Sequence, residues 1–436
     1  MDFSACTLTD PVPASFLCPK HSLIRCMQKL ILSNPVLGVQ SDSSKDLHSS
    51  RRVYLSRMLK LSCYGYEHED CYNESCLRGL WQGSLEEAIL PGDRKYFKEE
   101  NMTRIVDIHS HFYPKEYLDR MAKRKEFPNF EWTGPTSGIF HPMEGVVAGH
   151  VHRAGHYDAE ARIKDMDELG VDAQVLTLTA PDVQSFSPAE GVMWAKKTND
   201  YFAEICHKYP RRFYAMATLP YQDIDESLKE LDRAYKDLGV KGITMFSNIN
   251  GKPITLPEFY PIYEKASEYE LPIMIHPALT PLTAETMKMV RLPFQLFGFT
   301  LDTSIAVVGL IFQGVLEKYP KLKLLHCHLG GVVPYLVGRM EIDFRSYGKD
   351  WGHELPKTPS EYYKSQVYVD SISLHPPAMQ CCLDYVGIDH ICLGTDYPHR
   401  GGKPELFISS VKDMPLSEED TNKILGENAV RLLSLK

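Results

Sequence analysis

The sequence predicts a closed barrel of eight parallel β-strands alternating with helices, a (β/α)8 or TIM-type barrel of the α/β class, behind an irregular N-terminal extension. Three observations predict it: eight short apolar runs recur from Arg104 onward, helical segments separate them, and several runs end in histidine or aspartate. Alternating strands and helices build parallel sheets, and eight strands close a barrel. A chain of 436 residues is long enough, since such barrels can exceed about 250 residues as one domain.

The expected strands are short and rich in β-branched and aliphatic residues, which favour buried parallel strands. In chain order they are RIVDIHSHF, DAQVLTLTA, RRFYAMATLP, GVKGITMFSN, LPIMIHPA, KLKLLHCHLGG, SQVYVDSIS and HICLGTDYPH. An open, doubly wound sheet is the structural rival. It would normally carry a glycine-rich phosphate loop after its first strand, where this chain has HSHF.

Periodic apolar residues predict a helix after most of these strands. The expected helices cover residues 158–169, 190–207, 224–238, 259–269, 304–319, the segment VPYLVGRMEIDF, 376–385 and 418–433. The helix at 224–238 shows sequence features typical of both helix ends. Acidic residues lie in its first turns, and Gly239 follows its last turn.

Two further segments complete the domain organisation. Residues 1–103 are polar and strand-poor, so we expect an N-terminal extension that is partly disordered, followed by the barrel at 104–436. The longest insertion, 115–157, follows the first strand and contains FPNFEW, GIFHP and GHVHRAGH. An insertion there would sit over the carboxyl end of the barrel, so we expect a lid.

Composition excludes several classes of protein. The net charge of −9 comes without a basic stripe, which argues against binding of nucleic acid. No apolar run reaches the roughly 18 residues that a membrane span needs. The 11 cysteines are scattered, which favours reduced thiols and a cytoplasmic protein. The basic stretch KHSLIRCMQKLILS leaves a mitochondrial location as the alternative.

Histidines and an aspartate stand at the ends of several expected strands. His109 and His111 end the first, His276 the fifth and Asp396 the eighth, while the sixth carries His326 and His328. Any one of them could be a core residue. The carboxyl ends of barrel strands meet at one mouth, however, so we expect these side chains to converge.

Three histidines and one carboxylate suit a borderline divalent cation such as Zn²⁺. The metal charge lowers the pKa of a bound water towards about 7, and a further histidine can take or return a proton. His328 precedes Gly330 and Gly331, which permit close approach of backbone and substrate, so we assign His328 as the base and His326 to the core. Asp396 is either a ligand or a structural acid; its place after LGT favours a ligand. We expect Asp370 to have a core or supporting role.

Taken together, the sequence resembles the amidohydrolase superfamily and, within it, the amidohydrolase-related decarboxylases. The strings that carry the resemblance are VDIHSHFYPKEY, EARIKDMDELGV, YPRRFYAMATLP, IMIHPA, GVLEKYPKLKLLHCHLGGVVPYLVGR and LGTDYPH. They run from about Arg104 to the C-terminus, roughly three quarters of the chain.

The resemblance implies one zinc ion per chain, with His109, His111, His276 and Asp396 in the ligand positions. It implies that His328, together with Asp396, is catalytic. It also implies a homodimer in which Arg339 binds the substrate carboxylate in the neighbouring subunit's site.

The sequence departs from the family pattern around the substrate. Of two lid arginines, Arg153 fits one, whereas the other falls on Gly149. Ala278 stands where the family has a tryptophan that stacks on the substrate, and HGGG is HLGG here. The metal chemistry is therefore expected to be intact, while the substrate is expected to be a related carboxylic acid.

The leading functional hypothesis is a metal-dependent, non-oxidative decarboxylase (a carboxy-lyase) acting on a small unsaturated or aromatic carboxylic acid. Two alternatives remain at this stage. The same site could hydrolyse a substrate such as a lactone, or the chain could be a non-catalytic ligand-binding relative. The mass of the product distinguishes hydrolysis from decarboxylation. The presence of all five metal-site positions argues against a non-catalytic relative, since a binding protein has no need of a base at His328.

Overall fold

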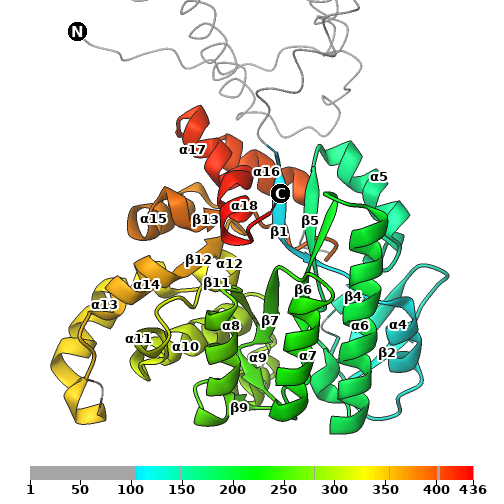
Figure 1. The fold of residues 1–436 in the computed structure, drawn as a ribbon, viewed down its shortest axis with the longest axis horizontal. Coiled ribbons are helices and arrows are strands. Elements are labelled where there is room, and N and C mark those ends of the chain that lie inside the picture. The colour runs from blue at the N-terminus through cyan, green and yellow to red at the C-terminus, as the bar shows by residue number, and fades with distance from the viewer. Residues whose placement is uncertain (1–103, 148, 279, 353, 400–402, 436) are drawn as a thin grey trace, which may run out of the picture. The chain divides into compact units, whose positions relative to one another are not determined.

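The structure, a computed structural model, describes residues 104–147, 149–278, 280–352, 354–399 and 403–435. The predicted extension, 1–103, lies outside the described residues. In the described part, eight strands form one sheet in the order β1-β5-β6-β7-β10-β11-β12-β13 (Figure 1). They are β1 (Val106–His111), β5 (Ala173–Thr177), β6 (Phe213–Thr218), β7 (Gly242–Phe246), β10 (Ile273–His276), β11 (Leu324–His326), β12 (Val367–Asp370) and β13 (Ile391–Cys392).

The sheet closes on itself. Neighbouring strands pair in parallel from β1 through β13. Backbone hydrogen bonds then join the last strand to the first: the Ile108 amide donates to the Leu393 carbonyl (2.9 Å) and the Asp396 amide to the His109 carbonyl (2.9 Å). Because the first and last strands are bonded, the predicted (β/α)8 barrel is confirmed and the open sheet is excluded.

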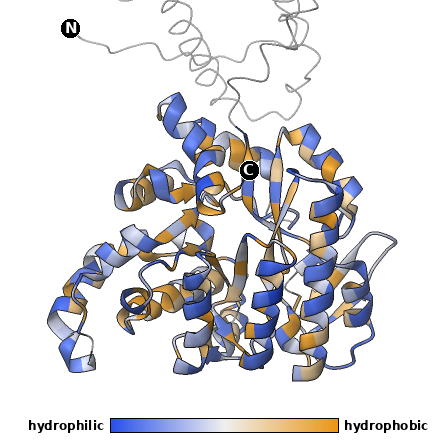
Figure 2. Ribbon diagram, in the orientation of Figure 1, coloured by the Kyte–Doolittle hydropathy of each residue, from blue (hydrophilic) through white to orange (hydrophobic). Residues whose placement is uncertain are grey.

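Helices form a layer around the strands (Figure 1). The main ones are α5 (Ala159–Leu169), α6 (Pro188–Lys208), α7 (Ile224–Lys236), α8 (Tyr260–Glu268), α10 (Gly298–Phe312), α13 (Val333–Tyr347) and α15 (Pro376–Val386). Side chains of Asp158, Ser187 and Asp223 cap the first three of them at the N-terminus. Figure 2 shows hydrophobic strands inside and hydrophilic faces on the surrounding helices, the pattern of a barrel with one buried core.

Some helices differ from the expected ranges. The segment 304–319 is broken, because Gly314 takes a left-handed φ of 72° between α10 and α11 (Val315–Lys318). The last expected helix contains a π-helical turn, η8 (Lys423–Glu427), between α17 (Glu418–Asn422) and α18 (Asn428–Leu432). Helices α9 (Pro281–Val290), α14 (Pro359–Gln366) and α16 (Pro404–Lys412) escaped prediction; each begins with proline.

The insertion after β1 folds into helix α4 and a small antiparallel sheet. It contains α4 (Lys115–Ala122), β2 (Asn129–Trp132), β3 (Gly138–His141), β4 (Gly149–Val151) and the 3-10 turn η3 (Ala154–His156). Phe130 and Phe140 are buried within it. Its end returns to the carboxyl end of β1, where the Tyr113 amide donates to the His156 carbonyl (2.8 Å). The insertion thus reaches the barrel mouth; we call residues 115–157 the lid segment.

The short elements complete the described part: β8 (Asn248–Ile249), β9 (Lys252–Pro253), η4 (Val183–Ser185), η5 (Pro257–Phe259), α12 (Cys327–Gly330), η6 (Lys349–Trp351) and η7 (Ile388–His390). No helix in the described ranges has both the length and the apolar composition to cross a bilayer.

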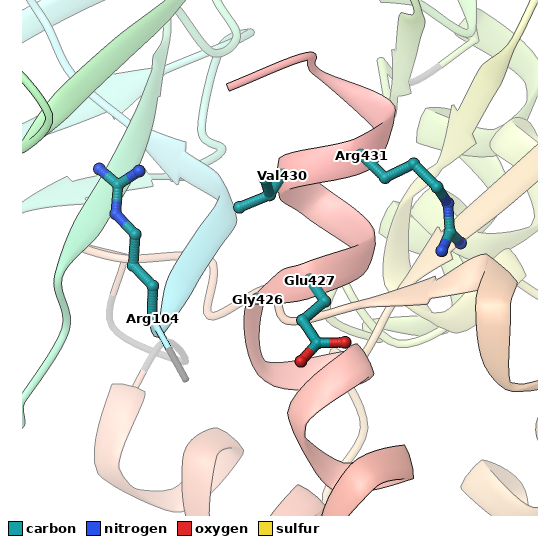
Figure 3. A pocket seen from close by; sticks show the side chains of 5 residues that line it. All are labelled: Arg104, Gly426, Glu427, Val430 and Arg431. Carbon is teal, nitrogen blue, oxygen red and sulfur yellow. The ribbon is translucent and has the colours of Figure 1, made fainter. Parts of the chain in front are cut away.

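A hollow lies at the amino end of β1, where Arg104 faces the C-terminal helical segment (Figure 3). The residues that line it are Arg104, Gly426, Glu427, Val430 and Arg431. The strand-end histidines lie at the carboxyl end of β1, so this hollow is separate from the candidate site.

Candidate metal centre and active site

Four side chains from three strand ends meet at the barrel mouth. His109, His111, His276 and Asp396 each offer a ligand atom, and these atoms all lie within 4.8 Å of one another. The His109 and His111 Nε2 atoms are 3.1 Å apart, and His111 Nε2 lies 2.9 Å from Asp396 Oδ1. All three histidines are buried. The convergence expected from the sequence is present in the structure.

Each of these histidines has its Nδ1 atom occupied by a hydrogen-bond partner. Asp370 Oδ2 accepts from His109 Nδ1 (2.7 Å), and the Pro277 carbonyl accepts from His276 Nδ1 (3.1 Å). The Thr177 hydroxyl donates its proton to the Ser110 carbonyl (2.9 Å), so it accepts from His111 Nδ1 (2.8 Å). Because every Nδ1 is a donor, every Nε2 of the neutral rings carries a bare lone pair.

This arrangement fits a divalent cation. Two bare nitrogen lone pairs at 3.1 Å repel unless a proton or a cation lies between them. Three imidazole nitrogens and one carboxylate are a ligand set that zinc and other borderline divalent metals accept. The backbone supports the fit, because Asp396 adopts a left-handed φ of 56°, a conformation tolerated mainly at functional positions and by aspartate.

Burial and charge hold most of the cluster in the metal-binding protonation state. Burial lowers the pKa of His111 to about 3 and that of His276 well below its usual value. For Asp396, burial raises the pKa, but the His111 hydrogen bond and the nearby histidines outweigh it and hold the pKa well below the ordinary value. For His109, burial is outweighed by Cys327 and Asp370, so the pKa is raised. In the absence of metal a proton therefore takes the place of the cation.

His328 lies beside the cluster on a left-handed turn. Strand β11 ends at His326, and His328 and Leu329 have φ values of 57° and 56°. Asp370 holds this turn, since its carboxylate accepts from the His328 and Leu329 amides (both 2.9 Å). The His328 ring centroid is 5.3 Å from that of His109. Burial lowers the pKa of His328, which leaves a neutral ring able to accept a proton.

His326 lies in the core, where its Nδ1 contacts the Tyr363 hydroxyl at 2.9 Å. Strand alternation does not relate the directions of the His326 and His328 side chains, because β11 ends at His326. The structure also gives a packing reason for the second of the two glycines that follow. A side chain at Gly331 would meet Ser304 Oγ at 2.3 Å, so close packing on α10 requires glycine there.

The two predicted substrate arginines lie in different places. Arg153 follows β4 at the barrel mouth, 5.7 Å from the Tyr397 ring and 3.6 Å from Asp165. Arg339 lies on α13, where its side chain is 78% exposed and contacts Asp343 at 3.6 Å. It is not part of the cluster formed by the histidines of its own chain. Gly149 lies on β4 and Ala278 directly follows Pro277 after β10.

Several site residues received no specific role from the sequence. Asp107 accepts from the Thr395 amide (3.1 Å) and hydroxyl (2.6 Å), which fixes the residue before Asp396. The fully buried Arg162 donates to the Gly155 carbonyl (2.9 Å) and to the His111 carbonyl. It thereby joins the lid segment to a ligand strand. The strings GTDYPH and EARIKDMD contain these partners but carry no spacing that identifies them.

Comparison with known proteins agrees with this geometry. The family model described as Amidohydrolase matches residues 106–435. A 2-amino-3-carboxymuconate-6-semialdehyde decarboxylase of Dictyostelium discoideum is 30% identical over 337 residues, which cover 76% of this chain and 91% of that protein. A gamma-resorcylate decarboxylase of a Rhizobium species is 29% identical over 63% of this chain and 87% of that protein.

A solved structure of 5-carboxyvanillate decarboxylase from Novosphingobium aromaticivorans, with bound manganese and a nitrobenzoic acid, has a TM-score of 0.67 and 27% identity. The match covers 77% of this chain and 98% of that one. The resemblance to amidohydrolase-related decarboxylases is therefore confirmed. With the family model spanning the whole barrel, this chain belongs to the amidohydrolase family.

Proposed function

We propose that the protein is a metal-dependent, non-oxidative decarboxylase of a small aromatic or unsaturated carboxylic acid. The observation that carries the proposal is that ligand atoms of His109, His111, His276 and Asp396 all lie within 4.8 Å of one another, with the His328 ring 5.3 Å from that of His109. Relatives named decarboxylases cover most of the barrel and support the same reaction class.

We assign His109, His111, His276 and Asp396 as the ligands of one divalent ion per chain, and zinc as the preferred ion. Histidine-rich sites with one carboxylate suit zinc, although the manganese in a related structure makes manganese the rival. A metal bound there would supply Lewis acidity towards an oxygen of the substrate or of water. Elemental analysis of protein purified without added metal distinguishes the two ions.

The chain's own residues account for the proton movements. The neutral His328 ring accepts a proton and returns it to the carbon that bears the carboxylate. The new C–H bond uses the electron pair of a carbon–carbon double bond at that carbon. The bond to the carboxylate then breaks, its electron pair restores the double bond, and CO₂ leaves. The acid anion and one proton thus become CO₂ and the protonated product, with no oxidant or reductant. We assign Arg153, which lies 5.7 Å from the Tyr397 ring, to hold a carboxylate of the substrate.

We also propose a homodimer, with a second copy of this chain on helices α9, α10 and α13. Large apolar side chains are exposed there, namely Leu282, Met289, Ile305, Tyr335 and Ile342, together with Trp351 on η6 just after α13. The helices are adjacent, since Phe312 of α10 and Phe344 of α13 have ring centroids 5.5 Å apart. Helix α13 projects from the barrel wall (Figure 1), and it carries Arg339, which would reach the partner's site.

The dimer is tested by light scattering on Tyr335→Glu. A buried charge at this interface should give a monomer, whereas Met193→Glu, at an exposed apolar residue on α6, should remain a dimer. A wild-type monomer at micromolar concentration would overturn the dimer. The cytoplasmic location stays a prediction.

The reaction is tested with metal-loaded protein and a panel of aromatic and unsaturated acids. Released CO₂ is trapped, and product masses are measured. Loss of CO₂ from at least one acid is the expected result, and His328→Ala, loaded with the same metal, is the control that should give none. Products that gain the mass of water instead would assign hydrolysis, and no turnover of any acid would contradict the proposal.

A further inference from the structure

A second group of histidines extends from the metal centre towards the lid segment. The His399 ring centroid lies 4.8 Å from that of His111 and 6.1 Å from that of His156. His152 follows, at 5.1 Å from His156. His399 comes from the turn after Asp396, whereas the other two come from the end of the lid segment. The group therefore links the ligand cluster to the lid segment, and the proposed reaction does not use it.

His156 has one nitrogen with a partner and one without. Its side chain is 1% exposed, and its Nδ1 lies 3.1 Å from the Arg153 carbonyl. A carbonyl only accepts, so Nδ1 carries the proton of the neutral ring and Nε2 is an acceptor. Among the described residues, no hydrogen-bond partner reaches that buried Nε2 atom. An unsatisfied buried acceptor destabilises the folded state, so an atom of this kind calls for an explanation such as a role in binding.

The surroundings keep this nitrogen an acceptor. Burial lowers the pKa of His156 to about 2, and the neighbouring His399 adds to the shift. The ring is therefore neutral at physiological pH. The His156 carbonyl is fixed by the Tyr113 amide (2.8 Å), and the preceding Gly155 carbonyl by buried Arg162 (2.9 Å). The acceptor is thus held in place relative to β1, which carries two of the ligands.

We propose that His156 is a specificity-determining residue whose Nε2 accepts a hydrogen bond from a hydroxyl or amino substituent of the substrate. His399 packs against the substrate between that substituent and the metal centre. The inference rests on the proposed function, because it deepens the substrate class of that reaction. It selects acids that carry a donor group at a distance from the carboxylate lost as CO₂. An unsubstituted acid would leave His156 unpaired, which is how a site rejects an analogue lacking a hydroxyl.

Two substitutions separate the acceptor from the rest of the ring. His156→Asn keeps a donor near the Arg153 carbonyl but removes the acceptor at the Nε2 position. His156→Gln places an amide oxygen near that position. His207→Asn, at an exposed histidine on α6, is the matched control. Thermal unfolding of each variant shows whether the fold is retained, and the glutamine variant keeps the test usable if the asparagine variant unfolds.

The experiment measures dissociation constants of metal-loaded protein for benzoate, its three monohydroxy isomers and 2,6-dihydroxybenzoate by calorimetry. In the wild type, at least one hydroxylated acid should bind about 10-fold more tightly than benzoate, which corresponds to about 1.4 kcal/mol for one such bond. That gain should fall below about 2-fold in His156→Asn and persist in His207→Asn. His156→Gln should recover part of it.

The outcomes distinguish this inference from the proposed reaction. A hydroxyl preference that is absent in the wild type, or unchanged in His156→Asn, overturns the role of His156 even when CO₂ is released. A preference that depends on His156 without any release of CO₂ supports the residue's role and contradicts the reaction. A co-crystal structure in which only a water molecule contacts Nε2 beside the bound hydroxylated acid would also overturn the inference.

Discussion

The histidines at the strand ends and those of the lid segment differ in the hydrogen-bond partners of their ring nitrogens. At the strand ends, each ligand histidine has its Nδ1 held by a rigid partner, as with Asp370 for His109 and Thr177 for His111. At the end of the lid segment, His156 keeps an unpartnered Nε2 atom among the described residues, and Arg153 is 43% exposed. The ligand histidines are oriented by partners within the chain, whereas His156 offers a nitrogen that another molecule must pair.

This difference indicates that the strand ends carry the catalytic groups and that the lid segment carries groups that recognise the substrate. Strands fix the metal ligands and their protonation states before any substrate arrives, which is what catalysis by positioned charge requires. Loops and insertions at the barrel mouth can change without disturbing that centre, so they carry specificity. Ala278 and Gly149, where the sequence departs from the family pattern, both lie outside the ligand set. The following predictions test whether the two regions are as independent as the structure indicates.

The largest effect is expected at the strand ends. His276→Ala removes a ligand, so metal content should fall below stoichiometric and turnover should drop by at least about 10³-fold. His328→Ala should lose turnover to a similar extent but keep its metal, because His328 is outside the ligand cluster. Metal analysis and CO₂ release on the same preparations measure both. Loss of metal from His328→Ala would show that the base and the ligand cluster are not separable.

Arg339 tests whether a residue of one subunit contributes to the site of its partner. Arg339→Ala should lower kcat/KM by about 100-fold without loss of metal, because a charged contact to the substrate is removed. If Arg339 serves the partner's site, dimers mixed from Arg339→Ala and His328→Ala chains contain one site with both residues intact. Random mixing should then restore roughly a quarter of the wild-type activity. Activity that stays at the level of the separate variants would place Arg339 outside the partner's site.

Asp370→Asn tests the support behind the ligands. The carboxylate orients His109 and also holds the His328 and Leu329 amides, so its loss should weaken metal affinity by about 10- to 100-fold. Competition with a chelator measures the affinity. Asp343→Asn, which changes only a surface partner of Arg339, is the matched control for metal binding and should leave it unchanged. Unchanged affinity in Asp370→Asn would mean that the β11 turn alone positions these groups.

The sequence predicted most reliably the features that follow from the alternation of strands and helices and from the meeting of strand ends in a barrel. Strand ends in a parallel barrel must meet, so His109, His111, His276 and Asp396 could be grouped without coordinates. The position of the His328 side chain could not be predicted in that way. It depends on a left-handed turn that Asp370, from another strand, holds in place. The lid sheet and the proline-initiated helices were also missed. Short antiparallel strands such as β3 and β4 have too few residues to show a period of two. The role of His156 could not be predicted either, because it depends on which of its ring nitrogens has a hydrogen-bond partner.

The last effect concerns a buried acid under the lid segment. Asp182 caps η4 through the Gln184 amide (3.0 Å), while its Oδ2 has no hydrogen-bond partner among the described residues. Burial raises the pKa of Asp182 to about 7, above the ordinary value of 3.8. The folded state therefore binds a proton that the unfolded state has released, and stability should fall as pH rises from about 4 to about 7. Asp182→Asn keeps the cap oxygen but cannot ionise. The free energy of unfolding of the variant should match that of the wild type near pH 4 and exceed it by up to about 4 kcal/mol at pH 8, since each pKa unit corresponds to about 1.4 kcal/mol. Parallel stability curves for the two proteins would show instead that this carboxylate is ionised and satisfied, which would remove one of the unpartnered polar atoms beside the lid segment.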